Sequence, residues 1–206
     1  MSENKEFEKK MLLTDEEYRL LAKSLAYCKY ADSQINYYFD TADFSMNNKK
    51  ITCRIRFKDG LYTTTIKKHN YGKKDLSIEE INEKSSVFDT KLFNAMGLEY
   101  KGSMVTERTV IYKNDFCEIV LDKNTYLLQE DYELEIEYKP QHEKESLMIL
   151  DSILSGMYDK TVYNDINFII KRMKNSMSKS ERFFERLKTE YIQDLLKNYD
   201  FSARWF

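Results

Sequence analysis

The chain has 206 residues, of which 42% are hydrophobic and 14% aromatic, a size and content that suit one domain with a sizeable core. One third of the residues are charged, yet the net charge is only −2, which argues against a generally basic nucleic-acid-binding protein. Three distant cysteines without a C-x-x-C pair argue against a disulfide framework or a zinc site. The first residues lack the apolar core of a signal peptide, and no apolar run approaches about 18 residues. We therefore expect a cytoplasmic protein with no nucleic-acid and no membrane partner.

Alternation of apolar and polar residues recurs from residue 5 to residue 139 and predicts a series of strands. In residues 51–58 (ITCRIRFK) the alternation is regular, and Asp59-Gly60 then predicts a hairpin turn. The predicted strands cover residues 6–13, 34–40, 51–58, 61–68, 76–82, 104–113, 115–122 and 132–139.

Helical patterns flank these strands. Thr14 and Glu17 form a capping-box sequence at the start of a helix predicted over 14–30. A second helix is predicted over 86–97. After Pro140 the pattern becomes helical over 143–156, 162–174 and 178–198. The order of elements predicts an α+β fold in one domain, 1–206, with a barrel over about 5–139 and C-terminal helices over about 143–198. We expect these helices to pack on the barrel; a lid or a homodimer contact is the alternative.

The charges on the polar strand faces are segregated by sign. The acidic positions are Glu6, Glu8, Asp122, Glu133, Glu135 and Glu137. The cationic positions are Lys10, Arg54, Arg56, Lys58, Lys67 and Arg108, with Glu80 between basic segments. Any single strand fits a solvated sheet face, but like charges two residues apart repel one another. The segregation therefore indicates a counter-ligand.

Closing eight such strands into a barrel would turn the charged faces inward. Unpaired charges inside a dry barrel would be prohibitively unfavourable, whereas a polyanion with divalent cations would satisfy them. Arginine donates two parallel hydrogen bonds to phosphate oxygens, and carboxylates supply the hard oxygen ligands that Mg²⁺ and Mn²⁺ prefer. The sequence thus predicts a closed eight-stranded antiparallel barrel that binds a polyphosphate together with metal.

Several segments in chain order resemble the CYTH domain family, the triphosphate tunnel metalloenzymes. Glu6-x-Glu8-x-Lys10 resembles the E-x-E-x-K signature of that family. The other segments that resemble family motifs are Tyr37-Tyr38-Phe39-Asp40-Thr41, Arg54-Ile55-Arg56, Thr65-Ile66-Lys67, Arg108, Leu121-Asp122, Glu133-Leu134-Glu135-Ile136-Glu137 and Lys179-Ser180-Glu181-Arg182-Phe183-Phe184. The last of these resembles a C-terminal segment of bacterial members.

The resemblance implies roles for individual residues. The implied phosphate ligands are Lys10, Arg54, Arg56, Lys58, Lys67 and Arg108. The implied ligands of Mg²⁺ or Mn²⁺ are Glu6, Glu8, Glu80, Asp122, Glu133, Glu135 and Glu137. The implied catalytic residues are Glu6, Glu8, Lys10 and Lys67. Two choices stay open: which two of the three glutamates at 133, 135 and 137 face the tunnel, and whether Glu79 or the preferred Glu80 does.

The same resemblance implies an enzyme that hydrolyses a small-molecule triphosphate. No base-reading motif is found, so inorganic tripolyphosphate or a broad range of organic and nucleoside triphosphates is the favoured substrate. One alternative is a class IV adenylyl cyclase, which makes cyclic AMP from ATP. The other is a non-catalytic module that senses a nucleotide or polyphosphate.

Overall fold

The structure is a computed structural model that describes residues 7–24, 31–69, 77–157, 166–174 and 176–189, with 192, 194 and 197 as single positions. Its centre is an eight-stranded sheet in which every pairing is antiparallel. The strands are β1 (Phe7–Leu13), β2 (Ala31–Asp40), β3 (Ile51–Lys58), β4 (Leu61–His69), β5 (Ser77–Ser85), β6 (Glu99–Lys113), β7 (Cys117–Tyr126) and β8 (Gln129–Tyr138). The α+β class predicted from the sequence is confirmed.

The strand order is β1-β8-β7-β6-β2-β3-β4-β5, so β1 and β5 are the two edges of the sheet. All seven residues of β1 pair with β8, and β5 pairs with β4 alone among the described strands. The prediction of a closed barrel is therefore not met within the described residues. The sheet is open between β1 and β5. Its buried carboxylates are neutralised by cations of the chain itself, which are described with the functional site.

Six α-helices surround the sheet within the described ranges. They are α1 (Asp15–Ser24), α2 (Ser45–Asn48), α3 (Lys91–Ala95), α4 (Glu143–Met157), α5 (Ile166–Lys174) and α6 (Lys179–Leu187), with a 3-10 turn, η1, over Pro140–His142. None of the helices that can be traced here combines the length and the apolar character needed to cross a bilayer. The helix predicted over 178–198 corresponds to α6, and its predicted continuation lies largely outside the described residues.

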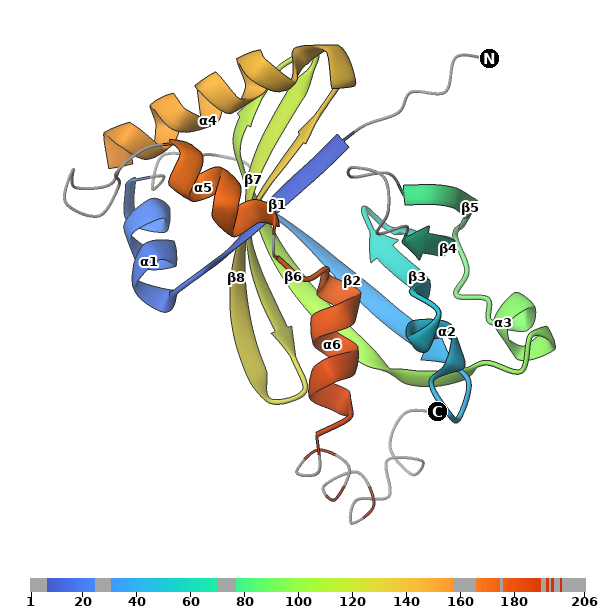
Figure 1. Cartoon of the computed structure of the whole chain (residues 1–206). Coiled ribbons are helices and arrows are strands. Elements are labelled where there is room, and N and C mark those ends of the chain that lie inside the picture. The colour runs from blue at the N-terminus through green and yellow to red at the C-terminus, as the bar shows by residue number, and fades with distance from the viewer. Residues whose placement is uncertain are drawn as a thin grey trace.

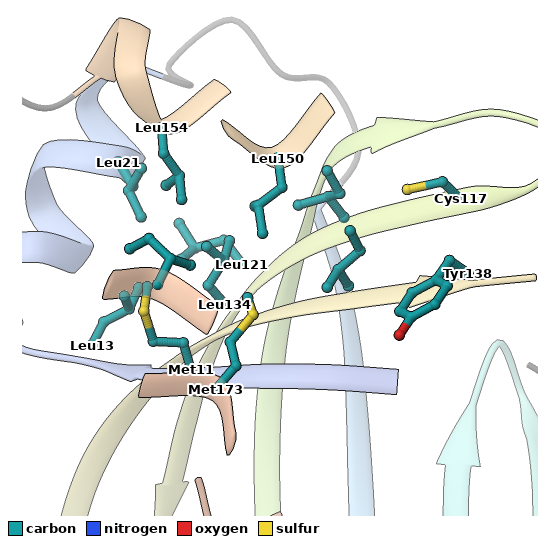
Figure 2. Packing of buried hydrophobic residues seen from close by; sticks show 13 residues of the cluster. Met11, Leu13, Leu21, Cys117, Leu121, Leu134, Tyr138, Leu150, Leu154 and Met173 are labelled. Atoms are coloured by element: carbon teal, nitrogen blue, oxygen red, sulfur yellow. The ribbon is translucent and has the colours of Figure 1, made fainter. Parts of the chain in front are cut away.

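Strand alternation gives the sheet one apolar face, and in the half formed by β1, β7 and β8 this face is covered by α1, α4 and α5 (Figure 1). Figure 2 shows Leu150 and Leu154 of α4 and Leu21 of α1 directed toward Leu121 and Leu134 of the sheet. All five side chains are buried, which at about 25 cal/mol per Å² of apolar surface makes this cluster a main source of stability. In the other half, Phe39, Cys53, Ile55 and Phe93 form a second cluster beside α3.

Local signals in the sequence are borne out at two turns. The Thr14 hydroxyl accepts a hydrogen bond from the Glu17 backbone N–H, and the Glu17 carboxylate accepts one from the Thr14 N–H, at 3.2 and 2.8 Å. Asp59 and Gly60 have φ values of 52° and 76°, the left-handed conformation that a two-residue hairpin between twisted strands requires.

Helix α6 packs on the polar face of the sheet, opposite the apolar core. Phe183 and Phe184 contact Tyr38 of β2, with ring centroids 4.7 and 5.9 Å apart, and Tyr126 of β7 adjoins Phe183 at 6.1 Å. The helix begins with a capping box between Ser178 and Glu181. In Figure 1, α6 stands between the β7–β8 hairpin and the β2–β3 half of the sheet.

One glycine permits this packing. Gly102 of β6 has φ +138°, and a Cβ built there would lie 2.9 Å from Cζ of Phe183. Only glycine combines this backbone conformation with so close an approach of an aromatic ring. The position coincides with a register shift between Tyr38 and Phe39 in the pairing of β2 with β6.

We expect Gly102→Ala to lower the free energy of unfolding by about 1–3 kcal/mol, because it adds backbone strain and displaces Phe183. Urea denaturation at equilibrium measures this change. Gly60→Ala is the matched control, since Gly60 also has positive φ but no atom lies within 4 Å of the place that a Cβ would occupy. Equal losses in the two variants would show that contact with Phe183 contributes nothing.

Candidate functional site

The strand register brings most of the predicted charged positions onto one face of the sheet, because directly paired residues in neighbouring strands share a face. The relevant pairs are Glu8↔Glu137, Lys10↔Glu135, Asp122↔Glu133, Arg108↔Asp122, Asn36↔Arg56, Thr52↔Lys67 and Lys67↔Glu80. Because strand residues alternate between the two faces, Glu133, Glu135 and Glu137 all lie on this polar face. The register therefore does not select two of the three glutamates.

At the centre of the polar face, three carboxylates surround a lysine from α6. The ammonium of Lys179 lies 2.9 Å from Asp122 Oδ2 and 2.9 Å from Glu135 Oε2, and it also donates to Glu133 Oε1. Asp122 and Glu133 are fully buried and Glu135 is 4% exposed. Buried carboxylates at this spacing repel strongly, so the lysine is what makes their ionised forms compatible with burial.

Two arginines complete the charge balance of this acidic cluster. Arg108 donates from Nε and Nη2 to both oxygens of Asp122, at 2.8 and 2.7 Å, and from Nη2 to Glu135 at 3.0 Å. Arg182 of α6 lies 2.7 Å from Glu133 Oε2 and donates from Nε to Asp131 at 2.8 Å. Lys179 and Arg182 of α6 thus neutralise carboxylates that, in the predicted tunnel, bound metal ions would neutralise. The charges of this cluster are therefore balanced even though the sheet is open.

Ionisation in this cluster follows from the same contacts. Burial alone would raise the pKa of Glu135, but Lys179, Lys10 and Arg108 outweigh it and hold that pKa well below its usual range. Burial alone would lower the pKa of Lys179, but Glu133, Glu135 and Asp122 raise it above its ordinary value. Both groups are therefore charged at neutral pH.

A second acidic group lies at the β1 edge. Carboxylate oxygens of Glu8, Glu135 and Glu137 lie within 4.8 Å of one another, as do those of Asp122, Glu133 and Glu135. Lys10 donates to Glu8. Burial lowers the pKa of Lys10, and although Glu133 and Glu135 oppose this, the ammonium groups of Lys179 and Lys67 lower it further.

The pKa of Lys10 is influenced by a charge from a distant strand of the polar face. Lys10 is in β1 and Lys67 is in β4, which are six strands apart in the order of the sheet. The charge of Glu135 likewise acts on Arg56 of β3. Cations and carboxylates from both halves of the sheet therefore act on one shared region.

The arginines of β3 differ from Arg108, because no carboxylate in the described ranges forms an ion pair with either of them. Arg56 donates from Nε to Asn36 Oδ1 at 2.9 Å, a neutral acceptor. The Nε of Arg54 is buried without a hydrogen-bond partner. Burial and the neighbouring Arg54 lower the pKa of Arg56 to about 9, the direction expected of a buried cation that lacks a counter-charge.

The remaining predicted positions are placed less centrally. Lys58 pairs with Asp32 at 2.6 Å, and its side chain is 40% exposed, so it lies at the rim of the polar face. Lys67 pairs with Thr52 of β3 and with Glu80 of β5 in the backbone register. Glu80 is placed by this backbone register alone. Glu6 lies outside the described residues.

Two groups of residues on this face were not assigned a role from the sequence. Lys179 and Arg182 belong to a segment that resembled a family motif, but only its contacts show that it supplies the central cations. Gln34, Asn36 and Tyr38 of β2 lie on the polar face beside Arg54 and Arg56. Their period of two is a usable signal, but uncharged residues in a strand do not by themselves indicate a ligand.

Fold and site together define an α+β protein whose sheet carries an acidic half and a basic half on one polar face. Residues 4–158 match the CYTH domain family, and the chain belongs to that family. It is 32% identical over 161 residues to YjbK of Bacillus subtilis (strain 168), provisionally named a triphosphatase. That match covers 69% of this chain and 82% of the relative.

Solved structures show the same fold. One from Bacillus halodurans, provisionally named an adenylate cyclase, is 23% identical with a TM-score of 0.61, covering 87% of this chain and 97% of the other. One from Hippeastrum, provisionally named an adenylyl cyclase and described as having a dominant triphosphatase activity, is 18% identical with a TM-score of 0.58. Coverage there is 88% of this chain and 96% of the other.

We expect Lys179→Met to lower the free energy of unfolding by about 3–5 kcal/mol in metal-free buffer, because it leaves three buried carboxylates without their shared cation. Added Mn²⁺ should restore part of this stability by binding those carboxylate oxygens. The melting temperature, measured with and without Mn²⁺, tests this expectation. The control is Lys144→Met, at an exposed position of α4. A Lys179→Met protein as stable as the control would contradict a structural role for this network.

Proposed function

We propose that this protein hydrolyses a small-molecule triphosphate, inorganic tripolyphosphate or a broader set of organic and nucleoside triphosphates, with Mg²⁺ or Mn²⁺. The carrying observation is that Arg54 and Arg56 have no carboxylate partner in the described structure, although a dense acidic cluster shares their face. An anion with several charged oxygens complements the arginines, and a divalent cation complements the acidic side. A metal-bound triphosphate supplies both.

In this proposal the cations of the polar face bind the phosphates. Arg54 and Arg56 offer planar donors to phosphoryl oxygens, and Lys10 and Lys67 approach from β1 and β4. Lys58 contacts the ligand at the rim, where it now pairs with Asp32. Arg108 is already engaged by Asp122 and Glu135, so its role is to hold these carboxylates in place as much as to meet phosphate.

The donor set fits a hard divalent cation, because three carboxylate oxygens lie within 4.8 Å in each acidic group. Lys179 already lies among Asp122, Glu133 and Glu135, so we assign the metal to Glu8, Glu135 and Glu137, with Glu6 and Glu80 as further ligands. A bound metal would neutralise phosphate charge and lower the pKa of a coordinated water. Lys10 would leave Glu8 and turn to a phosphate oxygen, and Glu6 or Glu8 would accept the proton of the attacking water.

We also propose that the sheet closes into a tunnel around the ligand. Lys10 and Lys67 face the same region from β1 and β4, and the charge of Lys67 lowers the pKa of Lys10 in the ligand-free protein. A polyanion between them would replace this repulsion with attraction to both sides. The edges of the sheet, β1 and β5, would then approach one another.

The resemblance to YjbK supports hydrolysis, since that relative bears a triphosphatase name. Cyclisation of ATP would use the same phosphate-binding residues, with a ribose oxygen as the attacking group. A sensor would bind phosphate through these residues without turnover. The cytoplasmic location, the single-domain boundary at 1–206 and a homodimer contact remain predictions from the sequence.

Incubation with tripolyphosphate and Mg²⁺ or Mn²⁺ should release phosphate, and EDTA should abolish the release. Arg56→Ala should lower kcat/KM by at least about a hundredfold, because it removes charge-assisted hydrogen bonds to phosphate, whereas Ala at the exposed Lys144 should not. Colorimetric phosphate detection measures both.

With ATP as substrate, ADP plus phosphate supports the proposal, whereas cyclic AMP plus pyrophosphate would identify a cyclase. Tight binding without any product would identify a sensor.

A further inference from the structure

Strand β2 carries buried hydrogen-bond donors that lack a partner in the part of the chain that the structure describes. Within those residues Asn36 Nδ2 and Gln34 Nε2 have no hydrogen-bond acceptor, and the two residues are 0% and 3% exposed. The Tyr38 hydroxyl continues the row toward α6. Because buried amide groups in proteins are normally hydrogen-bonded, two adjacent exceptions on one strand face require an explanation.

The orientation of Asn36 is fixed by its neighbour. Arg56 can only donate, and its Nε lies 2.9 Å from the Asn36 side chain, so the amide oxygen must face Arg56. The NH₂ group is therefore turned away from Arg56 with two hydrogens to donate. It presents donors, not acceptors, to the shared region of the polar face.

Gln34 lies two residues farther along β2, about 7 Å from Asn36 along the strand and on the same face. It pairs in register with Thr106 of β6, whose hydroxyl already donates to Asn124 at 2.7 Å. Two positions beyond Gln34, Asp32 is partly exposed, with 31% of its side chain accessible. Gln34 is thus the last buried donor of the row before the rim.

We propose that Gln34 and Asn36 form a neutral hydrogen-bond-donor subsite, beside Arg54 and Arg56, for the phosphoryl oxygens of the bound triphosphate. This inference rests on the proposed function and adds to it a binding element without charge. Phosphoryl oxygens are acceptors only, which matches the amide NH₂ groups that this row offers without a partner in the described structure. The amides leave the charge balance of the face unchanged, so they add directional contacts without repelling the metal on the acidic side.

The position of Gln34 gives it a further role in selectivity. At the other end of the row Tyr38 packs against Phe183 of α6, with ring centroids 4.7 Å apart, so we place a substituent on the triphosphate toward the rim. Gln34 then meets the phosphate that carries the substituent in an organic triphosphate. An unesterified phosphate presents one more acceptor oxygen there.

The decisive variant is Gln34→Met, which keeps volume and removes only polar atoms. Isothermal titration of the full chain with inorganic tripolyphosphate in EDTA should show binding about ten- to hundredfold weaker than in the wild type, the value of hydrogen bonds to a charged group. KM for tripolyphosphate with Mg²⁺ should rise by a similar factor. The ligand-free melting temperature should stay unchanged or rise, since Nε2 has no partner to lose. Asn36→Asp keeps the acceptor for Arg56 and should weaken binding further.

Thr106→Val is the matched control, because it removes a buried polar group from the same face whose hydrogen bond is already made within the protein. It should lower stability and leave tripolyphosphate affinity within about twofold of the wild type, since the hydrogen bond it loses stabilises only the protein.

Wild-type affinity and KM in Gln34→Met would overturn the subsite while leaving the proposed function standing. Equal weakening in Gln34→Met and Thr106→Val would also overturn it. A wild-type protein that neither binds nor hydrolyses tripolyphosphate would overturn the proposed function itself.

Discussion

The structure depends on one electrostatic constraint, the burial of several carboxylates on a single sheet face. Asp122, Glu133 and Glu135 are almost wholly removed from water, and they tolerate this because Lys179 and Arg108 touch them directly. Removing ions from water is unfavourable by several kcal/mol each unless partners of opposite charge are in contact. The position of α6 on the polar face follows from that requirement.

The same constraint divides the face into regions with different chemistry. Near β1, β7 and β8, carboxylates are gathered and neutralised by cations of the chain. Near β2 and β3, Arg54 and Arg56 have no acidic partner among the described residues, and the amides beside them offer donors. The protein is thus internally balanced on one side and complementary to an anion on the other. In the proposed function, this polarity would orient a metal-bound triphosphate across the sheet.

Much of the fold was predictable because strand and turn signals are local. Alternation located all eight strands, and Asp59-Gly60 located a hairpin from the two residues that favour left-handed φ. The prediction of a closed barrel was wrong for the described structure. Closure depends on whether the two edge strands, β1 and β5, pair with each other, and no local sequence pattern encodes that pairing. The charged positions of the site followed from segregation of charge.

The role of Lys179 could not be predicted, because it depends on a contact between residues 44 positions apart, Lys179 and Glu135. The amides of β2 could not be recognised for another reason. Their importance lies in hydrogen bonds that are missing, and a sequence does not show which polar atoms lack partners.

The placement of α6 has a consequence for how the chain is made. The eight strands are complete at Tyr138, whereas the first cation of α6 follows 41 residues later, at 179. During synthesis the sheet is therefore made before Lys179 and Arg182, and until α6 follows, Arg108 is the cation of the strands that pairs with Asp122 and Glu135. The polar face can complete its packing only once α6 has been made.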